Sequence, residues 1–542
     1  MRSGIISARS LAFVLAQAAV LSTAALAADP AMRSSPHDRT VYSRSAIPED
    51  AAPRKRRADG AGAGARGWSL DVEVIDTILS NTDPTLVSRR GASGGGETSI
   101  AVNPRDRRDI AITAFERPWF DDAGPASLLL STDGGQSWTQ ELRINPPPGV
   151  PAGGCPCDQT IDFSRRGVLT GAFLTPNGSG DFNIFTSSTR QPMTDGGFDW
   201  FEDPSGVAQP TNHDNPTSLG NADQPWMLVN HAPPDPWLVA SLEDGGGGRN
   251  RQNVYVAYDD FSTGPPTMHV AVAAEGVSPE FTLDSIDGVS SGFVNPGHRL
   301  ATDARTGVVY SLFQQRVAAG AGGSQNINYI LNRSLDGGQT WTLNGSSDGI
   351  VVANGDSTQP TPKFCTVNAL LGGVDHAAVD PRTGDVYYVY GNRDPDTGNN
   401  RLAVRRLTDD GSGGLTIGSE FFVTGQVQAA IPQVVVRDDG TVGVFFYTCD
   451  DDGTASGSFP QFSAYFSISQ DQGQTWSDTA LLTFLSPTMD NPANQRQRVL
   501  GDYMQTKSMR NTFYGSFSAN GAALGSPVAT IDPIFFRVGN GN

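Results

Sequence analysis

The sequence predicts an all-β protein: a β-propeller of four-stranded blades, with seven blades favoured and six as the alternative. Three observations support this fold. A short turn phrase recurs along the chain, and a second pattern of two paired strands recurs seven times. The 542 residues also include 62 Gly and 36 Pro but only 18% charged residues, and no long segment has the helical period.

The first segment of the chain, residues 1–27, has the features of a secretory signal peptide. Arg2 and Arg9 precede a mostly apolar run at 11–26, and Ala25-Leu26-Ala27 fits a small-residue cleavage site. The apolar run is short for a bilayer span, so a retained anchor is the less favoured alternative. We therefore expect a secreted protein, extracellular or periplasmic, without a membrane span.

Residues 28–67 read as a disordered basic leader or pro-segment. They are rich in Ala, Gly, Pro, Ser and Arg, and they contain the run Arg54-Lys55-Arg56-Arg57. A solvated linker is the favoured interpretation of this run, with contact to an anionic surface as the alternative. The rest of the chain, residues 68–542, is predicted to be one propeller domain.

The turn phrase occurs at 131–138, 334–341 and 469–476, and in a degraded form at 194–200. Its Asp can accept hydrogen bonds from backbone N–H groups of the turn, its Gly permits positive φ, and its Trp re-enters the next strand as an apolar plug. The spacing of the copies fits steps of roughly 68 residues, a plausible blade length. The residues assigned a structural role in these turns are Asp133, Trp138, Asp195, Trp200, Asp336, Trp341, Asp471 and Trp476.

The second pattern marks where each blade opens. In an up-and-down blade, the start of the first strand lies on one face of the ring, here called the upper face, together with the loop between the second and third strands. The turn phrases lie on the opposite, lower face. The seven first strands open near Glu97, Asp158, Asp223, Arg299, Asp375, Gln433 and Asp502. Close to these openings we expect further polar side chains, namely Gln159, Gln224, His298, His376 and Tyr503.

Four cysteines, Cys155, Cys157, Cys365 and Cys449, fit an oxidising compartment and lack a zinc-site spacing. We expect two disulfides. The pair Cys365–Cys449 is favoured because these residues fall in neighbouring blades, although the sequence leaves the connectivity open.

The net charge of −19 disfavours nucleic acid and anionic membranes as partners. We expect a monomer that binds a glycan or another small ligand and requires no cofactor. Ca²⁺ is the metal to consider, because Asp394-Pro-Asp-Thr-Gly398 and the run Asp450 to Asp452 present clustered oxygens, but solvated turns are the favoured interpretation.

The turn phrase resembles the Asp-box, or BNR repeat, of the sialidase superfamily and other Asp-box β-propellers. The first blade is similar to sialidases in its order: a strand ending in Ala114-Phe115-Glu116-Arg117, a loop acid, a strand and the turn phrase. The resemblance implies that Arg117 binds a substrate carboxylate through its planar donor fork. It also implies that Asp121 or Asp122 is the general acid/base and that Tyr503 is the nucleophile.

Arg299, Arg316 and Arg393 are the residues available to complete the arginine cluster that the resemblance implies. The chain departs from the family at Glu97-Thr98-Ser99, where sialidases have Arg-Ile-Pro. Two functions follow. The first is a secreted sialidase-like glycoside hydrolase, an exo-glycosidase of the exo-α-sialidase type that acts on terminal sugars. The alternative is a non-catalytic propeller that binds glycan, peptide or calcium on its upper face.

Overall fold

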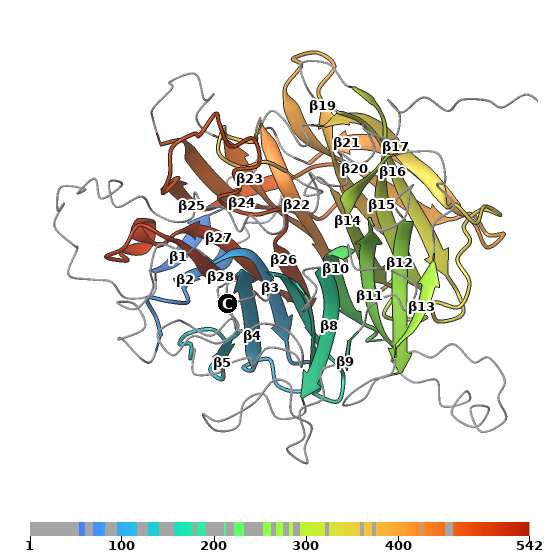
Figure 1. The fold of residues 1–542 in the computed structure, drawn as a ribbon, viewed down its shortest axis with the longest axis horizontal. Helices are drawn as coiled ribbons and strands as arrows, with labels where there is room; N and C mark the ends of the chain where they lie inside the picture. The colour runs from blue at the N-terminus through green and yellow to red at the C-terminus, as the bar shows by residue number, and fades with distance from the viewer. Residues whose placement is uncertain are drawn as a thin grey trace, which may run out of the picture.

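Seven β-sheets surround a common centre in the computed structural model, which confirms the predicted seven-bladed propeller (Figure 1). The structure describes residues 54–59, 69–81, 95–115, 128–139, 157–176, 182–189, 211–212, 222–231, 253–261, 267–274, 281–285, 293–319, 325–357, 363–370, 375–423, 425, 428–449 and 459–540. Helical structure in these residues is limited to a short 3₁₀ turn, Gly521–Leu524.

The blades follow one another along the chain. Blades 1 and 2 consist of β3 (Gly96–Val102), β4 (Ile110–Phe115) and β5 (Leu128–Ser131), and of β6 (Cys157–Phe163), β7 (Leu169–Pro176), β8 (Phe182–Thr189) and β9 (Thr211–Asn212). Blades 3 and 4 consist of β10 (Ala222–Val229), β11 (Asn253–Asp260), β12 (Thr267–Ala274) and β13 (Thr282–Ser285), and of β14 (Phe293–Thr302), β15 (Val309–Ala319), β16 (Gln325–Ser334) and β17 (Ile350–Ser357).

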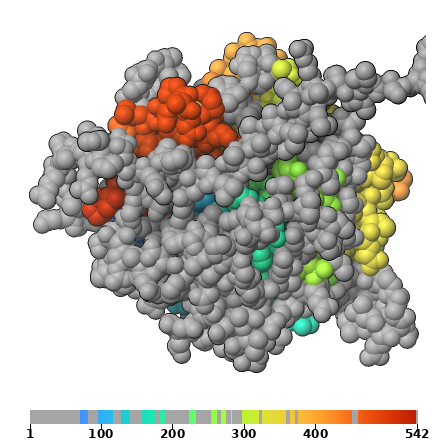
Figure 2. All heavy atoms as spheres, viewed as in Figure 1, coloured from blue at the N-terminus to red at the C-terminus, as the bar shows by residue number. Residues whose placement is uncertain are grey.

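The remaining blades complete the ring. Blades 5 and 6 consist of β18 (Asp375–Val379), β19 (Val386–Arg393), β20 (Asn400–Asp409) and β21 (Leu415–Phe422), and of β22 (Ala429–Val436), β23 (Val442–Cys449), β24 (Gln461–Ser469) and β25 (Ser477–Leu485). Blade 7 joins β26 (Gln505–Met509), β27 (Thr512–Asn520) and β28 (Ile531–Asn540) to two N-terminal strands, β2 (Ser69–Asp76) and β1 (Arg54–Asp59). In Figure 2, the region of blade 6 forms an orange surface patch at the upper left.

The first strand of each blade lies innermost. The inner strands β3, β6, β10, β14, β18, β22 and β26 contact one another in this order, and β26 returns to β3, so the ring is closed. Five of the seven predicted openings lie within three residues of the start of one of these strands, whereas Arg299 and Gln433 lie further along β14 and β22. The pattern of paired strands therefore identified the inner wall of the ring correctly.

Pairing between β2 and β28 closes the last blade. The two strands run antiparallel from Leu70 opposite Asn540 to Asp76 opposite Ile534. On its other edge β2 pairs with β1, from Arg54 opposite Val74 to Asp59 opposite Ser69. The prediction of a disordered leader is therefore wrong for these six residues. The physical reason is that β2 would otherwise leave a row of backbone N–H and C=O groups unpaired at the edge of the sheet.

Apolar side chains fill the spaces between neighbouring blades. Between blades 6 and 7, Phe445 packs its ring 5.3 Å from that of Phe517 and 5.7 Å from that of Phe536, measured between centroids. All three side chains are fully buried. Because every sheet presents both faces to a neighbour, the strands of the inner wall are buried on both sides and carry few charges beyond their upper ends.

The three described turn phrases share one hydrogen-bond pattern. In the copy at 131–138, the Asp133 carboxylate accepts from the backbone N–H of Ser137 at 3.0 Å and from its hydroxyl at 2.6 Å. The hydroxyl of Ser131 accepts from the N–H of Gly135 at 2.9 Å. Asp336 and Asp471 make the equivalent bonds in the other two copies. The degraded copy with Asp195 and Trp200 lies outside the described residues.

The turn phrases lie on the lower face, as the strand directions predict. Gly134 donates its N–H to the carbonyl of Arg108, which belongs to the turn between the first two strands of blade 1, at 2.9 Å. Trp138 is buried, and its indole N–H donates to the carbonyl of Gly135 at 3.1 Å. The Trp138 ring also packs 5.4 Å from that of Phe535 in blade 7. Each turn thus rests on the preceding blade.

A disulfide joins Cys365 to Cys449, as predicted, and ties the segment between blades 4 and 5 to the end of the second strand of blade 6. None of the described cysteines is free. Cys157 opens β6, whereas Cys155 lies outside the described residues. No helix among the residues that the structure describes is long and apolar enough to cross a membrane.

The two glycines of the first turn phrase give a matched test of blade docking. Both have positive φ, +81° at Gly134 and +94° at Gly135. A Cβ at Gly134 would meet only Arg537 Nη1 at 3.5 Å, whereas a Cβ at Gly135 would lie 2.3 Å from the ring of Phe535. We expect Gly134→Ala to lower the free energy of unfolding by about 1 kcal/mol, from backbone strain alone. Gly135→Ala should cost a further ~1–3 kcal/mol because it overpacks the joint between blades 7 and 1.

Urea unfolding of both variants and the wild type measures this difference. Equal decreases in the free energy of unfolding of the two variants would show that the preceding blade does not constrain the turn.

Candidate functional site

A bulge at the upper end of the inner strands turns polar side chains toward the ring axis. The ladder between the first and second strands shifts register at this point in blades 1, 2, 3, 4 and 6. Glu97, Asp158 and Gln224 adopt φ of +53°, +43° and +46° within these bulges, a strained conformation for residues with side chains. Such strain persists where the surrounding structure enforces it, and it is frequent at functional sites.

Three carboxyl groups from three successive blades form the centre of the candidate site. Asp158 of blade 2 interacts electrostatically and by a side-chain hydrogen bond with Glu97 of blade 1 and with Asp223 of blade 3. Glu97 and Asp158 are buried, whereas the side chain of Asp223 is partly exposed. Of the three carboxyl groups, that of Asp223 is therefore the most accessible to a ligand.

The cation that serves this acid cluster is Arg498, in the segment that leads into blade 7. Its Nη2 donates to Glu97 Oε1 and to Asp502 Oδ2. Burial would lower the pKa of Arg498, but the surrounding carboxylates, Asp502 and Glu97 foremost, raise it overall. Arg498 therefore stays charged and joins the first and last blades through their acids.

Crowding changes the proton affinity of these acids. Loss of solvation within the ring raises the pKa of Glu97 well above its usual range, and the neighbouring Asp158 and Asp502 raise it further against the effect of Arg498. Loss of solvation and the Asp158 carboxyl likewise raise the pKa of Asp223 well above its usual range. Adjacent carboxyl groups oppose one another's ionisation, so the protonated forms of Glu97 and Asp223 are favoured relative to those of free side chains.

A second cation, Arg299 of blade 4, lies beside the acid cluster. Its Nη2 donates to Gln224 Oε1 at 2.9 Å, and Gln224 Nε2 donates to Asp502 Oδ2 at 3.0 Å. The guanidinium carbon lies 4.6 Å from the ring centre of Trp226 and 5.3 Å from that of Tyr503. Arg299 is 1% exposed, so it supports the wall of the site and does not present a free fork to a ligand.

Tyr503 packs inside the same cluster. It is 1% exposed, and its hydroxyl donates to the backbone carbonyl of Gln159 at 3.2 Å. Burial raises the pKa of Tyr503 well above its usual range, and the neighbouring acids Glu97 and Asp158 raise it further. A nucleophilic phenol needs its proton removed by a nearby base, and this environment holds the proton in place.

Gln159, which follows Asp158 in β6, has a fully buried side chain whose amide oxygen and nitrogen both lack a hydrogen-bond partner among the described residues. Buried amides are rarely left in this state, because each unmade bond costs the desolvation of the group. The strand that carries the central acid therefore also carries unused hydrogen-bonding capacity.

Further titratable groups line the upper wall. Burial raises the pKa of Asp259 to about 7 against a hydrogen bond from the N–H of Gly297. Burial raises the pKa of Asp375 to about 6 although Tyr388 and Gln314 donate to it. Burial lowers the pKa of His298 and of His376 to about 3, so both imidazoles are neutral at physiological pH.

Among the predicted site residues, the structure brings Arg299 and Tyr503 into contact. Arg316 is exposed near the end of β15, and Arg393 is half-buried at the end of β19. Arg117, Asp121 and Asp122 lie outside the described residues.

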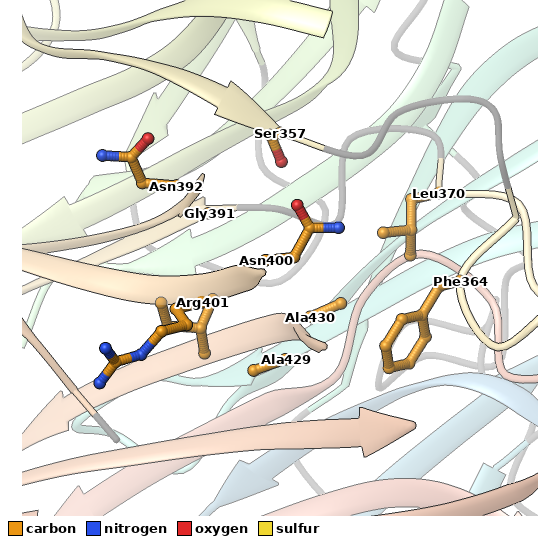
Figure 3. Close-up of a pocket in the computed structure, with 10 residues that line it drawn as sticks. Ser357, Phe364, Leu370, Gly391, Asn392, Asn400, Arg401, Ala429 and Ala430 are labelled. Atoms are coloured by element: carbon orange, nitrogen blue, oxygen red, sulfur yellow. The ribbon is translucent and has the colours of Figure 1, made fainter. Parts of the chain in front are cut away.

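A small cavity lies between blades 4, 5 and 6 near the upper face, close to the Cys365–Cys449 disulfide (Figure 3). Its volume is about 10 Å³, room for about one water molecule. This cavity is too small for a sugar ring. Its lining includes Ser357, Phe364, Leu370, Asn392, Asn400 and Arg401.

No group of three or more side chains able to hold a metal ion occurs in the part of the chain that the structure describes. Asp394, one of the residues considered for Ca²⁺, pairs with Arg401 at 2.6 Å and accepts backbone N–H bonds of its own turn. The run from Asp450 to Asp452 lies outside the described residues.

Arg498 is the functional candidate that sequence reasoning missed. It lies outside the repeated strand pattern, so it is not among the seven predicted strand openings or the polar residues close to them. The available signal was local: Arg496 and Arg498 come directly before Gly501-Asp502-Tyr503, the opening of the last blade. Two cations at that position could have indicated a partner for the acids that open neighbouring blades.

No model of a known protein family matches this sequence. A probable oligoxyloglucan-reducing end-specific xyloglucanase of Neosartorya fischeri is 28% identical over 133 residues, which cover 20% of this chain and 16% of that protein. Similar solved structures include a protein of unknown function from Dyadobacter fermentans, with a TM-score of 0.36 at 12% identity over 71% of this chain and 94% of its own.

Two further solved structures are enzymes. The α-L-arabinanase of Penicillium chrysogenum, complexed with arabinobiose, has a TM-score of 0.33 at 12% identity over 58% of this chain and 92% of its own. A Hadza microbial sialidase has a TM-score of 0.27 at 14% identity over 53% of this chain and 63% of its own. The seven-bladed ring is established by its own strand pairing, and these similarities add no evidence on function.

Titration of Asp259 should leave a signature in the stability of the protein. Its folded-state pKa, about 7, lies above the ordinary value of 3.8. The unfolded chain therefore releases this proton first, and the stabilising contribution, complete below about pH 4, is lost as the pH rises toward 7. The stability advantage of the wild type over Asp259→Asn should fall across this range by at most ~4 kcal/mol.

Asp471→Asn is the control of opposite sign. Although partial burial opposes the shift, the hydrogen bonds from Thr475 and Ser469 lower the pKa of Asp471. Its contribution should be present above about pH 4 and lost as the pH falls below it. Urea unfolding of the three proteins from pH 3 to pH 8 measures both trends, and a pH-independent difference for Asp259→Asn would contradict the assignment.

Proposed function

We propose that this protein is a secreted glycoside hydrolase that acts on terminal sugars of glycans at the upper end of the ring axis. The observation that carries the proposal is the contact between Glu97, Asp158 and Asp223, three carboxyl groups from three successive blades. Glycoside hydrolysis ordinarily needs two carboxyl groups in opposite protonation states, one to protonate the leaving oxygen and one to act as base or nucleophile. Crowded carboxyl groups reach such states near neutral pH.

We assign the general acid to Asp223. Its side chain is partly exposed, so it can meet a ligand, and its raised pKa favours the protonated form. Asp158, its neighbour in blade 2, is assigned the role of base or nucleophile. In this scheme the sugar enters between the two acids and replaces their mutual hydrogen bond. Asp223 then donates its proton to the glycosidic oxygen as the bond to the sugar carbon breaks, and Asp158 attacks that carbon or activates a water molecule.

Glu97 and Arg498 hold the two reacting acids in place. Glu97 interacts with Asp158, and it is fixed by Arg498. Arg498 also binds Asp502, so the cation spans the joint between the first and last blades. The unused amide of Gln159 offers a donor and an acceptor to a polar partner beside Asp158.

An uncharged terminal sugar suits this site better than sialic acid. Arg299 and Arg498 are engaged by protein groups and do not offer a free planar fork to a substrate carboxylate. Arg496, the third arginine near the cluster, interacts electrostatically with Asp223 and Asp502. The net charge of −19 also opposes an anionic substrate at long range. The protein matched over 133 residues is, by its name, a probable xyloglucanase.

The sialidase-like arrangement remains as a second scheme for the same activity. In it Asp121 or Asp122 is the acid/base, Tyr503 the nucleophile, and Arg117, Arg299, Arg316 and Arg393 bind the substrate. The burial of Tyr503 and its hydrogen bond to the Gln159 carbonyl favour a positioning role for this residue instead. The two schemes differ in which substitutions abolish turnover.

The assignment of Asp223 can be tested with substrates that differ only in the leaving group. With 4-methylumbelliferyl or alkyl glycosides, Asp223→Asn should lower kcat by about 10²–10⁴-fold, the usual contribution of a positioned acid. With a 2,4-dinitrophenyl glycoside, whose leaving group needs no proton, the loss should shrink to less than about tenfold. Asp158→Asn should be impaired on both substrates because it removes the base or nucleophile.

Asp375→Asn is the matched control, a buried acid of the same inner wall that is held by Tyr388 and Gln314. It should retain kcat within about threefold. Tyr503→Phe should also retain kcat within about threefold if the phenol only positions its neighbours. A decrease in kcat of about 10²-fold or more would support the sialidase-like scheme. Turnover that is absent in the wild type, together with saturable glycan binding, would support the non-catalytic alternative.

A further inference from the structure

A second cavity lies on the lower face, where blade 7 meets blade 1, away from the acid cluster. Its volume is about 560 Å³, within the usual size of small-molecule sites. One wall is the sheet of blade 7, and the other consists of two turns of blade 1. The lining residues are Asp71, Val72, Glu73, Asp106, Arg107, Arg108, Asp133, Gly134, Thr512, Tyr514, Arg537 and Gly539.

Strand register explains how blade 7 forms its wall. Glu73, Arg537 and Tyr514 lie opposite one another on β2, β28 and β27 and make one cross-strand row. Asp71, Gly539 and Thr512 make the next row on the same face. Gly539 leaves space in this wall, since a Cβ there would meet only Thr512 Oγ1, at 4.0 Å.

The charged groups of the cavity are nearly balanced. Four carboxylates and three arginines line it. Glu73 pairs with Arg537 and also accepts from Gln136 Nε2 at 3.1 Å, while Asp106 pairs with Arg108. Asp71 and Arg107 are both exposed, and neither forms an ion pair with a described residue, so one unpaired acid balances one unpaired cation. An anion site would need excess cations and a cation site an excess of unpaired acids, so this lining suits a neutral polar ligand.

We propose that the lower-face cavity binds a neutral oligosaccharide, as a site separate from the hydrolytic one. Sugar hydroxyls both donate and accept hydrogen bonds, and the arginine–carboxylate pairs offer acceptors and donors side by side. Tyr514, in the same cross-strand row as Glu73 and Arg537, provides an apolar surface for the C–H face of a sugar ring. The cavity would hold a glycan chain while the upper face remains open to a chain end.

The test is calorimetric titration of the full chain with four neutral tetrasaccharides: cellotetraose, xylotetraose, maltotetraose and mannotetraose. Glucuronic acid and glucosamine serve as the negatively and positively charged probes. At least one tetrasaccharide should bind with a Kd below about 10 mM, more tightly than either charged probe. Gly539→Leu, which fills the cavity, and Arg107→Ala should each weaken that binding at least about tenfold. Arg165→Ala, an exposed arginine in the equivalent turn of blade 2, should change it less than about twofold.

Thermal unfolding of each variant verifies that the ring is intact, and glycosidase turnover should be unchanged because these residues lie on the face opposite the acids. The proposal is overturned if no tetrasaccharide binds, if a charged probe binds more tightly, or if Gly539→Leu and Arg107→Ala, both folded, bind like the wild type. Loss of turnover in Asp223→Asn with tetrasaccharide binding retained would separate the two sites.

Discussion

The joint between the two ends of the chain is the constraint on which the rest of the structure depends. On the outer side, β2 pairs with β28 along seven residue positions. At the upper end of the axis, the N–H of Glu97 donates to the carbonyl of Leu500 at 3.1 Å, and the N–H of Asp502 donates to Glu97 Oε1 at 3.2 Å. The candidate acid cluster and the lower-face cavity both lie at this joint. Ring closure therefore brings Arg498 and Asp502 against Glu97 and forms the lower-face cavity, because both contacts exist only when blades 7 and 1 meet.

The sequence was informative where a local pattern enforces a local structure. Alternating apolar strands separated by turns such as Asp380-Pro381-Arg382-Thr383-Gly384 marked all seven inner strands, because these turn residues define strand ends without help from distant contacts. Three features depend on distant contacts and could not be predicted in this way. The leader strand β1 depends on the edge of β2, the positive φ of Glu97 and Asp158 depends on the bulges, and Arg498 acquires its partners only through ring closure.

The turn phrases show how docking between blades selects residues more strictly than backbone conformation does. The first glycine of the phrase is Gly134 in one copy but Gln472 in another, and both adopt positive φ, +81° and +65°. The second glycine is present in all three described copies. A Cβ there would lie 2.3 Å from Phe535 in the first copy and 2.6 Å from Val272 in the second. In the third copy the nearest atoms are 3.7 Å away. In two copies the preceding blade leaves no room for a Cβ, which explains the second glycine. In the third copy positive φ alone accounts for it.

The charge arrangement at the axis follows from one buried cation that lacks an acid of its own. Arg299 forms no direct ion pair with a described carboxylate; Gln224, the carbonyl of His298 and two aromatic rings hold it instead. Its charge therefore acts on several acids at once, including Asp375, Asp259 and Asp502, and it helps to keep His298 and His376 neutral. A directly paired carboxylate would have confined that field to one partner. Because the field is shared, it helps the inner wall to bury several carboxyl groups. The pKa of Asp223 is instead raised by burial and by the Asp158 carboxyl, which favours the protonated form.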